Sequence, residues 1–306
     1  MNQGIFGFPA ALGGTVLSTK QIDVSGTYLI APGTKRLVIF IVGAGGGGGG
    51  GGRRATGTAQ SGGAAGSGGS LAYQDFLVED LGGVNTTLSI VIGAGGIIGG
   101  AAASDTSAGV VGGAGGTTSI TPTGKPGILM DCLGGLGGAG GTTTLTTGGA
   151  ARTGYLYGAS LTHLIGAGSS AVGVPTNSPV STINSHQGAG GAGLATTPVA
   201  IVGGIIYIPA IGSTPVVSNP DFVRGNTIYS GGTNTVAPVD SYLHILGKMS
   251  PGFGGAGGGS GTTGGTKGGN GFRGSGGGGG GSTLNTFTAG TGGRGGDGYV
   301  CIVALA

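Results

Sequence analysis

The chain has 306 residues, of which 84 are glycine and 12 are proline. Charged residues make up only 7% and the net charge is +3, which excludes the dense basic surface of a nucleic-acid-binding protein. Two cysteines are too few for a disulfide-stapled scaffold. Glycine-rich chains of this kind are often disordered. The low charge and a mean hydropathy of +0.33 argue instead for ordered glycine.

Apolar runs rich in β-branched and aromatic residues predict a series of short strands, whereas no long run has the apolar spacing of a helix. The chain is therefore expected to be all-β, with almost no α-helix. Weaker strands are expected at Val199–Val202 and Ile205–Ile208, and a Gly/Ser/Ala/Thr loop at 53–69, with Arg53–Arg54 as a solvated turn. The main strands are expected at Thr15–Asp23, Thr27–Ile30, Arg36–Val42, Ser70–Val78, Thr86–Ile92, Thr117–Thr121, Ile128–Leu133 and Tyr299–Leu305.

Glycine blocks follow or separate these strands, and such blocks favour the polyproline-II conformation with three residues per turn. One rod of this kind has no internal hydrogen bonds, so rods are expected to pack side by side next to a conventional β core. The blocks lie at 43–52, 93–100, 112–116, 134–141, 188–193, 254–261, 264–269, 274–281 and 290–298. Alanines inside the blocks are expected to face outward: Ala44, Ala94, Ala114, Ala139, Ala192 and Ala256.

Enzymatic motifs are weak, so we expect no catalytic residues, cofactor or metal. Residues 43–48 match G-x-G-x-x-G, but no helix former follows, as a dinucleotide site would require. His163, His186 and His244 are isolated from other metal-ligating residues. Cys132 and Cys301 lie in apolar runs and are expected to be buried free thiols, with a disulfide between neighbouring strands as the alternative.

The domain organisation expected from composition has four parts. An apolar segment at 1–14 precedes glycine-rich sandwich and rods at 15–150, and 251–306 supplies further rods and the closing strand of the same domain. Between them, 151–250 is a loop-rich insertion with few glycine blocks and several aromatic residues. No signal peptide or membrane-spanning stretch is evident.

The order of these elements resembles the glycine-rich domain of bacteriophage tail-fibre and receptor-binding proteins. The resemblance rests on TYLIAPGTKRLVIFIVGAGGGGGGGG, GGSLAYQDFLV, TTLSIVIGAGG, GGTTSI and the terminal GGRGGDGYVCIVAL, and it covers about 1–141 and 252–306. It implies a jelly-roll-like β-sandwich flanked by packed polyglycine-II rods. It also implies a virion adhesin similar to the tip adhesins of T-even-like phage tail fibres, in which loops joining the rods touch the host receptor.

The functional expectations follow from this resemblance. The expected partners are a bacterial surface glycan or outer-membrane protein, other virion proteins and further copies of the chain, with a trimer favoured; no nucleic acid is expected. Receptor-contact candidates are the tyrosines of the insertion: Tyr155, Tyr157, Tyr207, Tyr229 and Tyr242. Ile5, Phe6 and Phe8 are candidates for attachment to the virion. The alternative is a structural virion or decoration fibre protein without a receptor.

Overall fold

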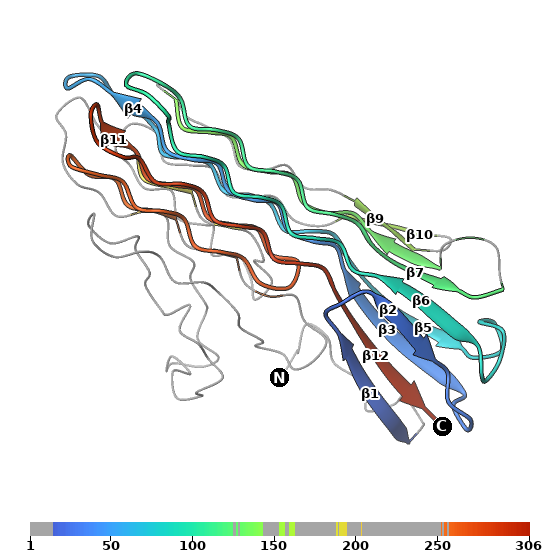
Figure 1. Cartoon of the computed structure of the whole chain (residues 1–306). Helices are drawn as coiled ribbons and strands as arrows, with labels where there is room; N and C mark the ends of the chain where they lie inside the picture. Colours follow the sequence, from blue (N-terminus) through green and yellow to red (C-terminus); the bar gives the residue numbers. More distant parts are fainter. Residues whose placement is uncertain are drawn as a thin grey trace, which may run out of the picture.

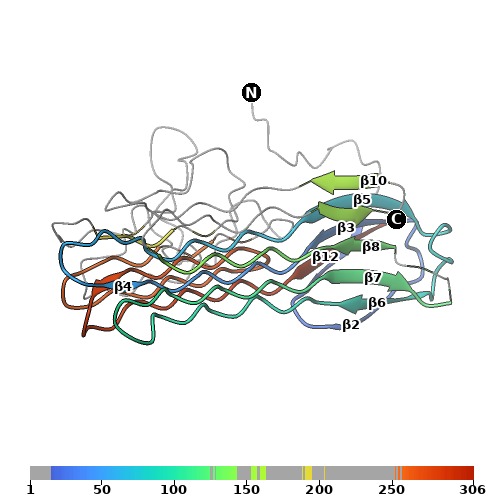
Figure 2. The ribbon, with the colours of Figure 1, turned by 90° about the horizontal axis from the view of Figure 1, so that it is seen from above.

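The computed structural model shows an elongated, all-β molecule in which a sandwich of strands continues into a bundle of extended glycine-rich rods (Figures 1 and 2). The structure describes residues 15–124, 127, 129–142, 153–156, 159–162, 188, 190–194, 203, 252, 254–255 and 257–306. These described residues include no helix, so none that could cross a membrane. The all-β fold class predicted from the sequence is confirmed.

The first sheet has four antiparallel strands in the order β1-β12-β3-β5. Its centre is formed by β3 (Arg36–Val42) and the chain-closing β12 (Tyr299–Leu305), with β1 (Val16–Ile22) and β5 (Leu71–Leu77) at the edges. Both central strands are continuous apolar runs because their two faces are both buried, so the usual alternation with polar residues is absent.

The second sheet has six antiparallel strands in the order β10-β9-β8-β7-β6-β2. Five of them pair with their neighbour in sequence and form a meander: β6 (Thr87–Val91), β7 (Thr118–Pro122), β8 (Met130–Cys132), β9 (Thr153–Leu156) and β10 (Ala159–Thr162). The sixth, β2 (Gly26–Leu29), pairs with β6. All eight main strands predicted from the sequence are present, whereas the β9–β10 hairpin was not predicted. The two weaker predicted strands lie outside the described residues.

The sandwich core lies between the two sheets. Alternate residues of β3 and β12, such as Ile39 and Ile302, meet Leu88, Ile90 and Ile120 of the second sheet, all of them almost completely buried. The remaining residues of β3 and β12 form a second buried cluster on the other face of the first sheet. The second cluster also fixes the register in which β3 and β12 pair. A slip by one residue would turn the side chains of each cluster to the opposite face of the sheet, and the two apolar faces differ in shape.

The rod at 43–52 leaves β3 and lies at the centre of the bundle, surrounded by six other rods. Its N–H groups donate in turn to three neighbours and its carbonyl oxygens accept from three others, as three residues per turn requires. The acceptor rods are 61–70, 109–116 and 290–298, and the donor rods are 93–102, 134–141 and 275–282. Backbone N–H and C=O groups of this buried rod are thereby paired without any strand or helix.

The rod at 275–282 is a second centre with six neighbours of its own. It donates to rods 43–52 and 264–272 and to the described residues of 188–194, and it accepts from rods 61–70 and 290–298 and from the described residues of 252–261. Rod 188–194 comes from the segment predicted as an insertion, so part of that segment belongs to the bundle. The glycine-rich sequence is ordered because each rod supplies hydrogen-bond partners that another rod lacks within itself.

The segment at 61–70, predicted as part of a loop, is a buried rod. Serine and alanine dilute its glycine, which hid the pattern, but Ser61, Ala64, Ser67 and Ser70 stand three residues apart, and the three serines contact one neighbouring rod. The hydroxyls of Ser61 and Ser70 donate to Thr142 O and Leu133 O at 3.0 and 3.2 Å. The Ser67 hydroxyl accepts from the Leu136 N–H at 2.9 Å. Short hydroxyl side chains therefore connect rod 61–70 to the rod at 134–141 and its flanking residues by hydrogen bonds, in a space that is too narrow for a longer side chain.

The alanines inside the glycine blocks divide into two groups. Ala94 and Ala114 are exposed on outer rods, as predicted, and Ala139 is half-buried. Ala44 and Ala192 are completely buried, which corrects the prediction that they face outward. Rod 43–52 has neighbours on all sides, so a residue within it has no outward face. Ala256 lies outside the described residues.

Substitution of Gly48 by alanine should destabilise the protein strongly. A Cβ at Gly48 would overlap the backbone carbonyl of Gly278, which cannot rotate away. A free energy of unfolding lower by about 3 kcal/mol or more, or failure to fold, is expected by denaturant titration. Gly100→Ala is the matched control: its Cβ would meet only the Val110 side chain, at 3.5 Å from Cγ2 and 3.7 Å from Cβ, so stability should be equal or higher by about 0.4–1 kcal/mol. Equal losses for both variants would contradict the packing argument.

The two cysteines are buried and free, as predicted. They cannot pair, because Cys132 lies in the cluster between the sheets and Cys301 in the cluster on the opposite face of the first sheet. Burial raises the pKa of the Cys132 thiol to about 12, so this thiol stays neutral and unreactive at ordinary pH.

Neither thiol should therefore react with Ellman's reagent in the native protein at about pH 8. Both should react once the chain is unfolded in guanidinium, since the Cys132 pKa then returns toward its ordinary value and the reagent gains access. Rapid release of one equivalent of thionitrobenzoate from the native protein would show that one cysteine is accessible.

Candidate functional site at the tip of the rod bundle

The end of the bundle farthest from the sandwich is formed by loops that connect the rods (Figure 1). Three of them lie together: 53–60 after the central rod, 103–108 between rods 93–102 and 109–116, and 283–289 before rod 290–298. Two short parallel strands at this end, β4 (Arg53–Arg54) and β11 (Thr283–Leu284), join the first loop to the third.

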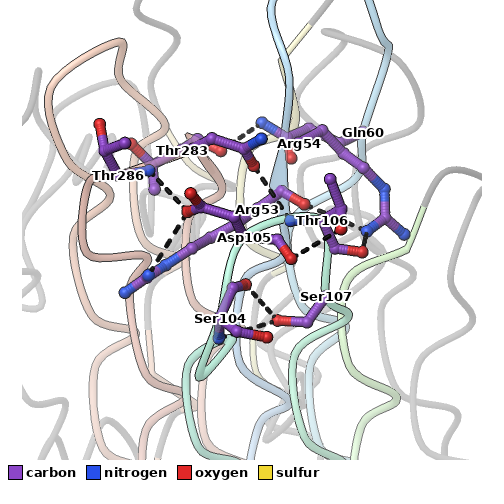
Figure 3. Close-up of polar contacts among 10 residues, drawn as sticks. Arg53, Arg54, Gln60, Ser104, Asp105, Thr106, Ser107, Thr283 and Thr286 are labelled. Atoms are coloured by element: carbon purple, nitrogen blue, oxygen red, sulfur yellow. Dashed lines mark hydrogen bonds and ion pairs between the residues drawn. The ribbon is translucent and has the colours of Figure 1, made fainter.

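The first loop is held by arginine side chains that reach its neighbours (Figure 3). The Arg54 guanidinium donates to the Thr106 carbonyl, and Arg53 Nη1 lies 3.9 Å from Asp105 Oδ1. The Gln60 side-chain amide donates to the Thr283 carbonyl at 2.6 Å, in a completely buried position. Arg53–Arg54 is thus a half-buried strand and not the solvated turn that the sequence predicted, because Arg54 donates to the Thr106 carbonyl and Arg53 forms an ion pair with Asp105 of the same loop.

The second and third loops are joined by two reciprocal contacts. The Asp105 carboxylate accepts from the Thr286 N–H at 2.6 Å, and the Asn285 side-chain oxygen accepts from the Thr106 N–H at 3.0 Å. Within the second loop, the Ser107 hydroxyl donates to the Ser104 carbonyl. Each loop therefore holds the other by a side chain bonded to a backbone amide, so the loops form one ordered surface (Figure 3).

Two threonines at these contacts have left-handed backbones, Thr106 with φ of 58° and Thr286 with φ of 71°. This conformation is unfavourable for a β-branched residue by about 1–3 kcal/mol and persists only where neighbouring contacts enforce it. Here the amides of both residues are fixed by Asn285 and Asp105. Strain of this kind is concentrated at binding and switch regions, so it supports the tip as a candidate site.

The surface that the loops present combines small hydroxyl groups with one aromatic ring. Phe287 is 38% exposed, although an apolar ring would ordinarily be buried. The three loops also carry exposed small polar residues: Thr56, Thr58, Ser104, Thr106, Thr286 and Thr288. An aromatic anchor among adaptable hydrogen-bonding groups is the composition of a recognition surface. The described residues hold no cluster of three His, Cys, Asp or Glu that could bind a metal.

The residues predicted from the sequence are not brought together by the described structure. Tyr155 falls in β9 of the sandwich, where only the backbone is described. The other four receptor candidates, Tyr157, Tyr207, Tyr229 and Tyr242, lie outside the described residues, as do the attachment candidates Ile5, Phe6 and Phe8. Their roles remain predictions.

Sequence reasoning missed the tip residues, although a signal for them exists. Two seven-residue segments, ASDTSAG at 103–109 and TLNTFTA at 283–289, are glycine-poor interruptions between glycine blocks. Rods that pack side by side must be joined by turns at their ends, so such interruptions mark the end of the bundle. Which interruptions meet in space depends on the packing order of the rods, which glycine repeats do not encode.

The family model of the glycine-rich domain matches residues 21–305 of this chain. The chain therefore belongs to the glycine-rich domain family, and the match includes both the sandwich and the rods. A search of curated proteins finds no match.

Replacement of Asp105 by alanine should loosen the tip without unfolding the protein. The Thr286 N–H would lose its acceptor, so amide hydrogen exchange in 283–289 should become faster, while the free energy of unfolding should fall by no more than about 1 kcal/mol. Glu79→Ala, an exposed site after β5 at the sandwich end, makes the same charge change and should leave exchange at the tip unaltered. Unchanged exchange in Asp105→Ala would show that the reciprocal contacts do not order the loops.

Proposed function

We propose that this protein is a non-enzymatic virion adhesin of a bacteriophage, part of a tail fibre or another surface appendage, which contacts the bacterial host. The observation that carries the proposal is the ordered tip, where three loops fixed to one another display Phe287 among exposed hydroxyl groups. The resemblance of the element order to tail-fibre glycine-rich domains points to the same end of the molecule.

The rod bundle suits an adhesin because it holds the tip loops at a distance from the sandwich. Rods paired along their whole length by backbone hydrogen bonds make a stiff spacer, which places the loops away from the sandwich. Loops on a rigid scaffold can change in sequence without disturbing the fold, as recognition requires. The partner we propose at the tip is a surface glycan or an outer-membrane protein, and the other partners are virion proteins and further copies of the chain, in a trimer.

One observation favours the second candidate, a structural fibre protein without a receptor. Rods 93–102 and 109–116 carry four exposed aliphatic side chains on the flank of the bundle: Ile97, Ile98, Val110 and Val111. The Ile97 side chain of the first rod lies over Gly113 of the second, and the Val110 side chain of the second lies over Gly100 of the first. The aliphatic side chains of the two rods therefore lie side by side. Exposed apolar groups gathered in this way are typical of a protein contact surface.

A cell-binding experiment separates the two candidates. Fluorescently labelled protein is incubated with a panel of bacterial strains, and binding to susceptible cells is measured by flow cytometry. The Phe287→Ala variant should lose at least tenfold in affinity if the ring is an anchor of about 1.4 kcal/mol or more. Val111→Ala removes an exposed apolar group from the flank and should bind like the wild type.

The other outcomes point elsewhere. Loss of binding in Tyr157→Ala or Tyr207→Ala, with normal binding in Phe287→Ala, would place the receptor surface in the 151–250 segment. Absence of wild-type binding to every strain, together with incorporation of the protein into virions, would favour the structural role.

A further inference from the structure

A hollow of about 370 Å³ lies where the rod bundle meets the sandwich, at the opposite end of the rods from the tip. Its walls come from the ends of rods 264–272 and 290–298 and from Asp23, which follows β1. The two rods are neighbours, since the Gly271 N–H donates to the Arg294 carbonyl at 2.8 Å. The volume is near the lower end of the range for small-molecule sites.

The side chains around the hollow follow from the three-residue period of the rods. Asn270 and Arg273 stand three apart on one rod and its turn, and Arg294 and Asp297 stand three apart on the other. Three of the four positions between them are glycines, Gly271, Gly295 and Gly296, where a Cβ would overlap backbone atoms, and the fourth is Phe272. The polar side chains are therefore gathered on one outer face and converge at the junction with the sandwich.

The four charged groups of the hollow form two ion pairs and sum to zero. Arg273 Nε lies 2.9 Å from Asp23 Oδ1, and Arg294 Nη2 lies 2.6 Å from Asp297 Oδ1. Arg273 is fixed further by the Tyr299 ring, whose centroid is 4.1 Å from its guanidinium carbon. The pocket therefore has no surplus charge of either sign to attract a charged ligand, so a neutral ligand is favoured.

Arg294 and Asp297 also offer unused hydrogen-bonding capacity beside one another. Asp297 Oδ1 accepts from Arg294 and from the Gly95 N–H, while Oδ2 has no donor among the described residues. Within the described part of the chain, Arg294 donates a side-chain hydrogen bond from Nη2 alone, which leaves Nε and Nη1 as donors. A hydroxyl group donates and accepts at once, so adjacent hydroxyls of a sugar fit a guanidinium next to a carboxylate.

We propose that this hollow, named here the junction pocket, binds a neutral pyranose sugar. Arg294 and Asp297 hydrogen-bond neighbouring hydroxyls of the sugar, and Asn270 and Phe272 line the same pocket beside them. The site goes beyond adhesion through the tip and is distinct from it in position and chemistry.

Saturation-transfer NMR and calorimetric titration of the purified full chain test the proposal. The probes are D-glucose, D-galactose, L-rhamnose and N-acetyl-D-glucosamine, with D-glucuronate and D-glucosamine as charged comparators. At least one neutral sugar should bind, and Arg294→Ala should weaken that binding about tenfold or more, as expected for lost hydrogen bonds to a charged group. Asn270→Ala should weaken it to a smaller degree and serves as a second variant.

Lys267→Ala is the matched control, because Lys267 is exposed on the same rod three residues before Asn270 and does not line the pocket. It should bind sugar like the wild type, and Phe287→Ala at the tip should do so even if cell binding is lost. No binding of any neutral sugar, stronger binding of a charged comparator, or unchanged affinity in a folded Arg294→Ala protein would each overturn the proposal.

Discussion

The hydrogen bond from one glycine rod to the next is the interaction on which this structure depends. A polyproline-II rod has no bonds within itself, so an isolated rod cannot bury its backbone without losing water as a partner. Rods 43–52 and 275–282 resolve this by giving and receiving bonds on all sides, six neighbours each. At the glycine positions of both rods a Cβ would overlap the backbone of a neighbouring rod, which is why both rods are almost pure glycine.

The sandwich supplies the burial of large apolar side chains that the rods lack. Backbone hydrogen bonds contribute only about 0.5–1.5 kcal/mol each, whereas ordering a residue costs about 1–2 kcal/mol, and glycine loses the most freedom. The two apolar clusters around β3 and β12 bury large side chains and anchor the ends of the rods that leave these strands. Arg273 extends this anchoring at the junction, where it contacts both Asp23 and Tyr299.

The packing of the rods determines which side chains each part of the bundle can carry. Interior rods tolerate glycine, alanine and serine, so chemical variety is confined to outer rods and to the turns between rods. One flank is aliphatic at Ile97 and Val110, another is charged at Arg294 and Asp297, and the tip combines hydroxyls with Phe287. Both proposed binding sites arise where this constraint is relaxed, at the two ends of the bundle.

The sequence by itself determined the strands and most of the rods, because β-branched runs such as VIFIV and uninterrupted glycine are local properties of the chain. It also predicted the free thiols from their apolar surroundings. Only the tertiary structure decided that 61–70 is a rod, that Ala44 is buried, and that Asp105 meets Thr286 and Arg273 meets Asp23. Glycine repeats are alike wherever they occur, so they carry no code for which rod neighbours which. That order is set by the β pairing and the turns, and it alone brings residues distant in sequence to one surface.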